Sequence, residues 1–451
     1  MRYRRAVVLL SVMGVLAAAC GNGETTDTTA ATDTTVAEAP DTTEATSDLS
    51  EFEFTPGHAC FFSAHHLFVP EGEGDGAVTL LADAGIISKN GYIGDPVEDP
   101  ELDGDPDPNI ALEDGVDIVT IADGSPNALM VSEYLRSNGI AARPVHLIAM
   151  AGHWQVKPGN DPEAADENLL QPGDAPDGSR LIAVVDTAMV ETSYGWVLDG
   201  VDADHVVGQD PHDLGASHGT FISSLIRQVT PDVTVAFASL PAMDKNLYFQ
   251  SWPDGQLGSF TPTNVTSEIP AYEAILDLIP RLTDGAVEPS ALSLSWGTYP
   301  CDSDIQMGGP VLGEMIALAA TIDMWQASFP EAPIFAAAGN EPPDHGPFFP
   351  AADADVVGVA ADGGNGMALV WDDATPVTAT LDWANIFAPG CDLIGVSGVD
   401  EPGPVVAWGG SSFATPLAAL TWMDSGMPPS AAATMPTAGM LKGPVSPTPR
   451  C

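Results

Sequence analysis

Gly410-Ser411-Ser412-Phe413-Ala414-Thr415-Pro416 is the stretch that decides the fold of this 451-residue chain, because three shorter upstream segments complete its chemistry. These segments are Val184-Val185-Asp186-Thr187, Ser217-His218-Gly219-Thr220 and Ala337-Ala338-Gly339-Asn340. A serine hydroxyl becomes a nucleophile when an adjacent base removes its proton, and a carboxylate can hold a histidine base in the correct tautomer. Ser412, His218 and Asp186 are therefore candidate catalytic residues, as nucleophile, base and orienting carboxylate.

The order in which these residues occur, Asp, His, Asn and then Ser, resembles that of the subtilase superfamily of serine proteases. Trypsin-like enzymes run His, Asp, Ser, and α/β-hydrolases run Ser, Asp, His. The resemblance spans residues 180–424. It implies a subtilisin-like three-layer α/β/α fold with a mostly parallel sheet. It also implies that the side-chain amide of Asn340 and the backbone N–H of Ser412 form an oxyanion hole.

Other segments resemble the substrate-binding parts of the same family. Ser295-Trp296-Gly297 is similar to the strand whose backbone pairs with an extended peptide. Ala338 and Gly339 are small, and so we expect them to leave room for a substrate side chain beside Asn340. Phe349-Pro350-Ala351 resembles a turn that contains a cis proline. The chain departs from the family pattern with residues that remove no catalytic group: Ala188, Ser411 and Phe413.

Two neighbouring classes of hydrolase are excluded by the same residues. Sedolisins use an aspartate at the oxyanion position and a glutamate as base, whereas this chain has Asn340 and His218. The Gly-x-Ser-x-Gly elbow of α/β-hydrolases is nearly imitated by residues 410–414. That segment ends in Ala414, and no histidine follows it in the sequence.

The region that contains the motifs alternates short apolar runs with helical patterns, which predicts parallel strands joined by crossover helices. The apolar runs are continuous, as in strands buried on both faces: Leu181–Val185, Val233–Leu240, Ala291–Ser295, Ile334–Ala338 and Val356–Ala361. We expect covering helices over Thr266–Leu282 and Val311–Phe329, a helix from Thr220 to Arg227 after His218, and a helix over Ser412–Asp424. Sites in open parallel sheets form at the carboxyl ends of strands, where Asp186, Ser295 and Asn340 fall.

Residues 1–20 have the pattern of an export signal. Arg2, Arg4 and Arg5 precede an apolar run that ends at Cys20. Leu16-Ala17-Ala18-Ala19-Cys20 resembles a bacterial lipobox, which implies lipidation of Cys20; an ordinary signal peptide with an incidental cysteine is the alternative. Residues 21–50 are rich in Thr, Asp and Glu and lack aromatic residues, so we expect a disordered tether.

Residues 51–157 form the next region. Val116–Ile121, Asn127–Ser137 and Val145–Met150 predict a β-α-β unit, with Gly139 as the helix cap. The position of this unit is similar to that of a subtilase propeptide, which implies that the N-terminal region could inhibit its own catalytic domain; an unrelated module is the alternative. Residues 158–180 are a predicted linker, 181–424 the catalytic domain, and 425–451 a Pro-rich tail that we expect to be disordered.

The formal net charge is −50, from 13 basic and 63 acidic residues. Nucleic acids and anionic lipid headgroups both need a positive surface, so this balance excludes them as partners. Membrane association is expected only through a lipid at Cys20. No metal-ligand spacing is present, and we expect no cofactor; a structural calcium ion is common among subtilases, but the sequence does not place one.

Four cysteines remain after the lipobox, Cys60, Cys301, Cys391 and Cys451, and they allow three complete pairings. We favour Cys301–Cys391, because each of the two follows a strand end that is expected to border the cleft.

These residues together predict an exported subtilisin-like serine endopeptidase that acts on polypeptides. We expect it to be lipid-anchored at the outer face of the cell membrane or released after processing. The alternative is a catalytically inactive subtilase scaffold that binds peptides or a partner, because the C-terminal part of the domain is truncated.

Overall fold

The structure, a computed structural model, describes residues 60–90, 116–122, 128–150, 162–174, 176–203, 206–207, 214–240, 248–251, 257–260, 265–283, 285, 287–299, 316–372, 375–398 and 403–427. The chain divides into two units, Met1–Ala45 and Thr46–Cys451, and all described residues belong to the second. The predicted signal (1–20), the tether (21–50) and the tail after residue 427 lie outside the described residues.

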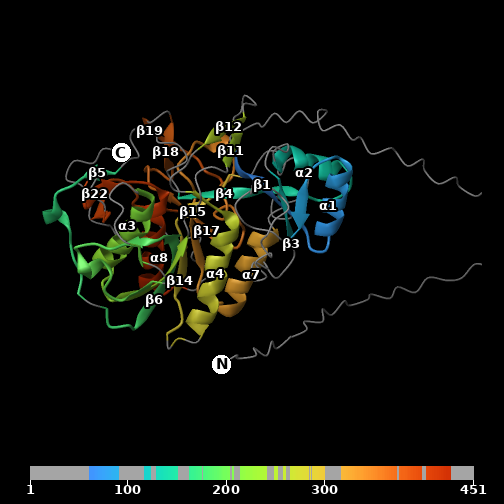
Figure 1. The fold of residues 1–451 in the computed structure, drawn as a ribbon. Helices are drawn as coiled ribbons and strands as arrows, with labels where there is room; N and C mark the ends of the chain where they lie inside the picture. The colour runs from blue at the N-terminus through green and yellow to red at the C-terminus, as the bar shows by residue number, and fades with distance from the viewer. Residues whose placement is uncertain are drawn as a thin grey trace, which may run out of the picture. The chain divides into compact units, whose positions relative to one another are not determined.

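A seven-stranded sheet forms the centre of the region that carries the motifs (Figure 1). All neighbouring strands pair in parallel. In spatial order the strands are β20 (Ile386–Ala388), β17 (Val356–Ala361), β16 (Ile334–Ala337), β14 (Ala291–Leu294), β6 (Arg180–Thr187), β10 (Val233–Leu240) and β8 (Val201–Ala203). The five apolar runs that predicted strands all lie in this sheet.

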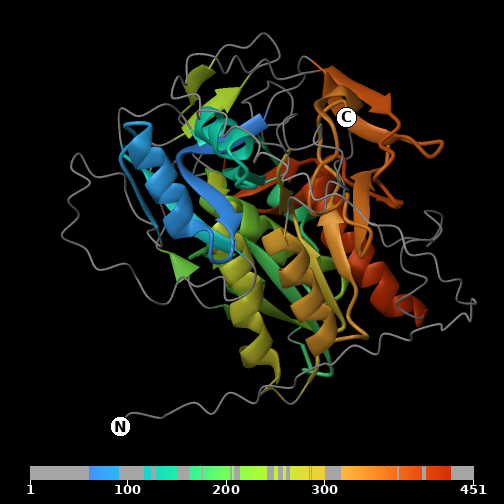
Figure 2. The same cartoon turned by 90° about the vertical axis from the view of Figure 1, so that its right-hand side faces the viewer.

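Helices cover both faces of this sheet. Successive residues of β6 alternate between two cores: Ile182 and Val184 belong to the core under α3 (Leu214–Val229) and α8 (Ser411–Ser425). Ala183 and Val185 belong to the core under α4 (Glu268–Thr283) and α7 (Ile316–Ser328), which lie side by side (Figures 1 and 2). The predicted three-layer α/β/α architecture with a mostly parallel sheet is confirmed.

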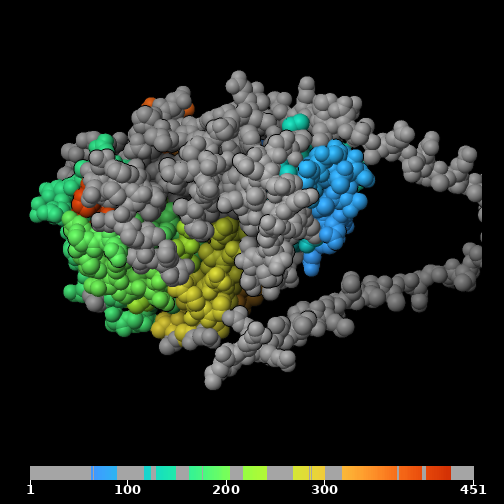
Figure 3. Space-filling view, in the orientation of Figure 1, coloured from blue at the N-terminus to red at the C-terminus, as the bar shows by residue number. Residues whose placement is uncertain are grey.

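Helix α4 illustrates how these layers follow from sequence. Its apolar residues at helical spacing, among them Ile275, Leu278 and Leu282, are buried, whereas Asp277 is exposed. The outer side of α4 accordingly reaches the surface (yellow in Figure 3). In the part of the chain that the structure describes, no helix combines the length and apolar character needed to cross a membrane.

A second sheet of eight strands combines the N-terminal region with segments from the middle of the chain. Its core is closed by α1 (Gly74–Asp83) and α2 (Ala128–Ser137). The strands are β1 (Cys60–Pro70), β2 (Ser88–Asn90), β3 (Val116–Ile121), β4 (Arg143–Met150), β11 (Tyr248–Ser251), β12 (Leu257–Phe260), β13 (Val265–Ser267) and β15 (Trp296–Gly297). The predicted β-α-β unit is present as β3, α2 and β4, with β1 pairing to both strands.

The remaining elements are short. They are β5 (Glu163–Ala164), β7 (Met189–Val190), β9 (Val206–Val207), β18 (Ala368–Asp372), β19 (Thr375–Ala379), β21 (Leu393–Val396), β22 (Val405–Trp408), and three 3₁₀ turns, η2 (Glu167–Leu169), η3 (Gly195–Val197) and η4 (Pro343–His345). Strand β5, which falls in the predicted linker, pairs with β22. The Phe349–Pro350 peptide bond is cis, as its resemblance implies.

One prediction about a helix boundary is wrong. The helix expected to begin at Thr220 begins at Leu214, so His218 lies inside α3 rather than before it. The glycine-containing segment 74–76 lies inside α1, which begins at Gly74.

Candidate active site

Asp186 and His218 form a buried pair at the carboxyl end of β6. The imidazole Nδ1 lies 2.7 Å from Asp186 Oδ1, and both side chains are inaccessible to solvent. The backbone N–H of Thr187 donates to the same carboxylate oxygen at 2.8 Å. Because the carboxylate accepts hydrogen bonds, Nδ1 carries the proton in the neutral ring, and the lone pair lies on Nε2.

Gly219 explains how α3 comes close enough to β6 for this contact. A methyl group on Gly219 would lie 2.3 Å from the carbonyl oxygen of Thr187. The Gly219 N–H donates to Thr187 Oγ1 at 2.9 Å, which ties the helix to the strand end. The glycine after the histidine is therefore required by the close packing of helix and strand.

Aromatic side chains hold the His218 ring beside the segment that contains Ser412. The ring centroid lies 4.9 Å from that of Phe413 and 5.5 Å from that of Trp408, with the Trp408 ring nearly perpendicular. Phe413 directly follows Ser412 in the chain. The structure thus brings Asp186, His218 and the Ser412 segment together from three distant parts of the sequence.

Ser412 lies in the first turn of α8 and is linked to Ser295 in both directions. Its hydroxyl donates to the Ser295 carbonyl at 3.0 Å, and the Ser295 hydroxyl donates to the Ser412 carbonyl at 2.7 Å. Both serines are buried. The N-terminal turn of a helix carries a partial positive charge, which favours a negative charge that develops nearby.

Asn340 follows β16 and faces the start of α8. Its Oδ1 accepts a hydrogen bond from the Ser411 N–H at 2.7 Å. Its Nδ2 is buried and has no hydrogen-bond partner among the described residues. A methyl group on Gly410 would lie 3.0 Å from this Nδ2, so the glycine keeps the space beside the amide open. An amide donor held in this way can bind an oxyanion.

The candidate substrate-binding residues lie around these groups, but other parts of the chain contact them. Trp296 and Gly297 pair in antiparallel register with Met150 and Ala149 of β4, so β4 occupies that strand edge. The carbonyl of Ala338 accepts from Trp383 Nε1 at 2.8 Å. Beside Gly339, where we expected room for a substrate side chain, the side chains of Tyr299 and Phe348 approach the glycine instead.

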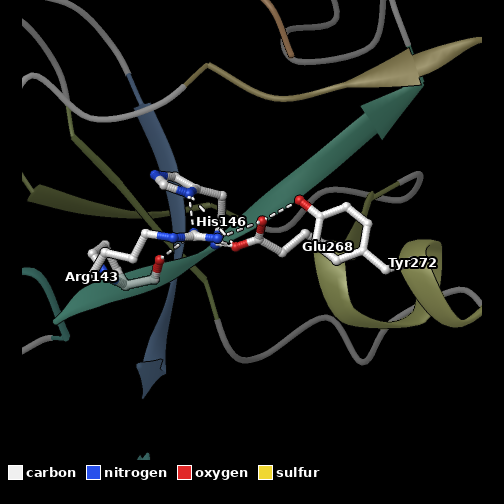
Figure 4. A network of polar contacts seen from close by, with 5 residues as sticks. Arg143, His146, Glu268 and Tyr272 are labelled. Atoms are coloured by element: carbon white, nitrogen blue, oxygen red, sulfur yellow. Dashed lines mark hydrogen bonds and ion pairs between the residues drawn. The ribbon is translucent and has the colours of Figure 1, made fainter. Parts of the chain in front are cut away.

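A buried ion pair joins β4 to α4 (Figure 4). Arg143 donates to both oxygens of Glu268, at 2.6 and 3.2 Å, while the His146 N–H and the Tyr272 hydroxyl donate at 2.8 and 2.5 Å. Burial by itself raises the pKa of Glu268, but the charge of Arg143 and the hydrogen bonds from His146 and Arg143 outweigh it. The pKa of Glu268 is therefore held well below its usual range.

Sequence reasoning missed several of these residues. No local pattern pointed to Tyr299 or Phe348 beside Gly339, or to Trp408 against His218. The pairing of Arg143 with Glu268 also left no signal, because the two residues are 125 positions apart. The two glycines, Gly339 and Gly410, were present in the motifs and could have indicated a crowded backbone, since glycine permits close approach.

Cys20 and Cys301 lie outside the described residues. Cys391 is disulfide-bonded, and its pairing with Cys301 stays a prediction. Within the described ranges, no group of three or more His, Cys, Asp or Glu side chains is arranged to hold a metal ion.

The chain is similar to several solved structures of peptidases. No family model and no curated protein matches the chain. Among solved structures, fervidolysin from Fervidobacterium pennivorans, a keratinolytic enzyme related to subtilisin, is 14% identical with a TM-score of 0.45, and the match covers 87% of this chain and 62% of that one.

Two further peptidases of known structure match as well. The nisin leader peptidase NisP from Lactococcus lactis is 15% identical over 58% of this chain and 82% of that one, with a TM-score of 0.35. The prenylagaramide maturation protease PagA is 16% identical over 55% and 78%, with a TM-score of 0.34. At identities of 14–16% and TM-scores of 0.34–0.45, these matches transfer no activity, and the function of this chain rests on its own site.

Proposed function

We propose that this chain is an exported subtilisin-like serine endopeptidase that hydrolyses peptide bonds in polypeptides. The observation that carries the proposal is the buried 2.7 Å contact between His218 Nδ1 and Asp186 Oδ1, held beside the Ser412 segment. Export and lipid attachment at Cys20 are part of the proposal and rest on the pattern of residues 1–20.

In the proposed mechanism, Ser412 Oγ attacks the scissile carbonyl and its proton passes to His218 Nε2. Asp186 stabilises the imidazolium that forms, and His218 then gives the proton to the leaving amine. The oxyanion lies against the amide of Asn340, whose Nδ2 is available for it. The Ser412 hydroxyl donates to the Ser295 carbonyl at 3.0 Å, so the mechanism requires it to turn toward His218 before the attack.

The N-terminal region (residues 51–157) is the proposed inhibitor of this site. An extended peptide gains much of its affinity by adding to an exposed strand edge. Strand β4 pairs with Trp296 and Gly297, the edge that the substrate would use. This contact supports a latent form in which residues of the chain itself occupy the substrate position.

Covalent labelling tests the proposal. An alkyl fluorophosphonate needs no pairing with the strand edge that β4 occupies, so it should label the full-length protein at Ser412. Ser412→Ala should abolish labelling. Ser223→Ala is the matched control, because Ser223 is an equally buried serine that donates to the Val197 carbonyl. The alternative, an inactive scaffold, requires that Ser412 stays unlabelled while the protein is folded.

Peptidase assays extend the test to the other two residues. Asp186→Ala and His218→Ala should each lower kcat by roughly 10⁴-fold or more, and the double substitution should lose little beyond either single one, because the three residues act as a unit. Losses that multiply in the double variant would contradict the assignment.

A further inference from the structure

The side chain of Phe348 spans the space between the two backbone segments that flank Ser412. One segment is Ser295–Gly297, which hydrogen-bonds to Ser412, and the other is Ala338–Asn340. A methyl group on Gly297 would lie 2.3 Å from Phe348 Cε1, and one on Gly339 would lie 3.2 Å from Phe348 Cγ. The tip of the ring is thus against one segment and its base against the other.

This ring is fixed in place by its neighbours. Thr298 and Phe349 exchange two backbone hydrogen bonds, at 2.8 and 2.9 Å, which tie the chain beside Phe348 to the segment after Gly297. The ring of Tyr299 packs on that of Phe348 with centroids 4.7 Å apart. Both aromatic side chains are fully buried. Displacing a side chain that is packed on several sides costs free energy.

A substrate must place a side chain in the same space. If the scissile carbonyl lies within reach of Ser412 Oγ and Asn340 Nδ2, the residue that carries it lies between Ser295–Gly297 and Ala338–Asn340. Its side chain then points between these two segments, where Phe348 already lies. We propose that Phe348 closes the pocket for this residue and restricts it to glycine, alanine or serine.

The inference rests on the proposed peptidase function and names its substrate class: polypeptides with a small residue on the N-terminal side of the scissile bond. An apolar pocket discriminates between side chains that differ by one methylene by roughly 10- to 200-fold. A benzyl group is larger than a methyl group by much more than one methylene. We therefore expect the pocket to discriminate between phenylalanine and alanine by at least this factor.

Three covalent reagents test the pocket in the full-length protein. An alkyl fluorophosphonate carries no amino-acid side chain and reports only whether Ser412 reacts. Two aminoalkyl diphenyl phosphonates carry the methyl side chain of alanine or the benzyl side chain of phenylalanine. With these, Ser412 Oγ bonds to phosphorus and phenol leaves with the serine proton. Each phosphonate contains a single residue, so its reaction does not depend on backbone pairing with Trp296 and Gly297.

The wild type should react faster with the alanine reagent than with the phenylalanine reagent, by roughly 10- to 200-fold or by a larger factor. Phe348→Ala should remove or reverse this ratio, and the milder Phe348→Leu, which keeps part of the core filled, should reduce it. Phe329→Ala, a buried phenylalanine that packs on Trp325 after α7, is the control and should keep the wild-type ratio.

The outcomes separate the two proposals. No fluorophosphonate label at Ser412 would overturn the peptidase function itself. Labelling by the fluorophosphonate with equal rates for the two phosphonates, or with no reaction of the alanine reagent, would overturn the closed pocket and leave the peptidase function standing. An unchanged ratio in the folded Phe348 variants would show that another residue sets it.

Discussion

Glu268→Gln should strongly destabilise the fold, because it removes the charge that compensates Arg143. The two side chains are 0% and 5% exposed, so the guanidinium would remain buried without its partner. Breaking a buried ion pair on one side costs about 3–5 kcal/mol. Glutamine keeps one acceptor oxygen, but its amide nitrogen cannot accept the bonds that Arg143 and Tyr272 donate to Oε2. We therefore expect a fall of about 3–5 kcal/mol in the free energy of unfolding at pH 7.

The pH dependence gives a second measure of the same contact. The pKa of Glu268 is lower in the folded protein than in the unfolded chain, where it is about 4.3. Its stabilisation is thus fully present above that value and is lost as the pH falls toward the folded pKa. Below about pH 4 the wild type should lose about 1.4 kcal/mol per pH unit relative to Glu268→Gln, so the difference between them narrows.

Urea denaturation followed by circular dichroism measures both effects. Glu133→Gln is the matched control, because Glu133 pairs with Arg136 on α2 but is partly exposed; such pairs contribute at most about 1 kcal/mol. Arg143→Met combined with Glu268→Leu should cost much less than Glu268→Gln, because no uncompensated charge remains. If Glu268→Gln costs no more than Glu133→Gln, or if the difference does not change with pH, the reasoning is refuted.

Two further predictions concern the geometry around Ser412. Asn340→Ala should lower kcat by roughly 10²–10³-fold with little change in KM, because the amide acts on the oxyanion; a loss confined to KM in steady-state peptide assays would contradict this role. Gly219→Ala should push α3 away from Thr187 and displace His218 from Asp186, and such a displacement lowers kcat by roughly 10²-fold. Gly195→Ala is its control, because a methyl group there meets nothing within 4 Å, and equal losses in the two variants would contradict the packing argument.

The central sheet could be predicted from sequence because its strands are buried on both faces. Val233–Leu240 and Val356–Ala361 are continuous apolar runs, and the structure has β10 and β17 over those residues. The start of α3 could not be predicted in the same way. Glycine disfavours a helix interior by about 1 kcal/mol, so local propensity opposes a helix that runs through Gly219. Its close approach to the Thr187 carbonyl, a tertiary contact, is what requires glycine inside the helix.

The candidate site shows the same division between local and distant information. Ser412, His218, Asp186 and Asn340 each lie in a short recognisable motif, so their positions were predicted from sequence. The occupants of the space beside them come from elsewhere in the fold. Phe348 reaches Gly297 across about 50 positions of chain, and no periodicity or spacing encodes that contact.

Strand β4 contacts the rest of the fold at several places along its length, and this bears on how a latent form could open. Its first residue, Arg143, is held by Glu268, and its residues 147–149 pair with β13. Only its last two residues, Ala149 and Met150, pair with Gly297 and Trp296. A peptide that pairs with this edge therefore needs to displace only the end of β4. Because the pKa of Glu268 is held well below its usual range, the carboxylate also stays charged in mild acid, and the anchor at Arg143 persists. In the proposed peptidase, freeing the substrate edge and releasing the N-terminal region are thus separate events. We expect Glu268→Gln to lower the free energy of unfolding strongly but to raise kcat/KM for extended peptides only slightly.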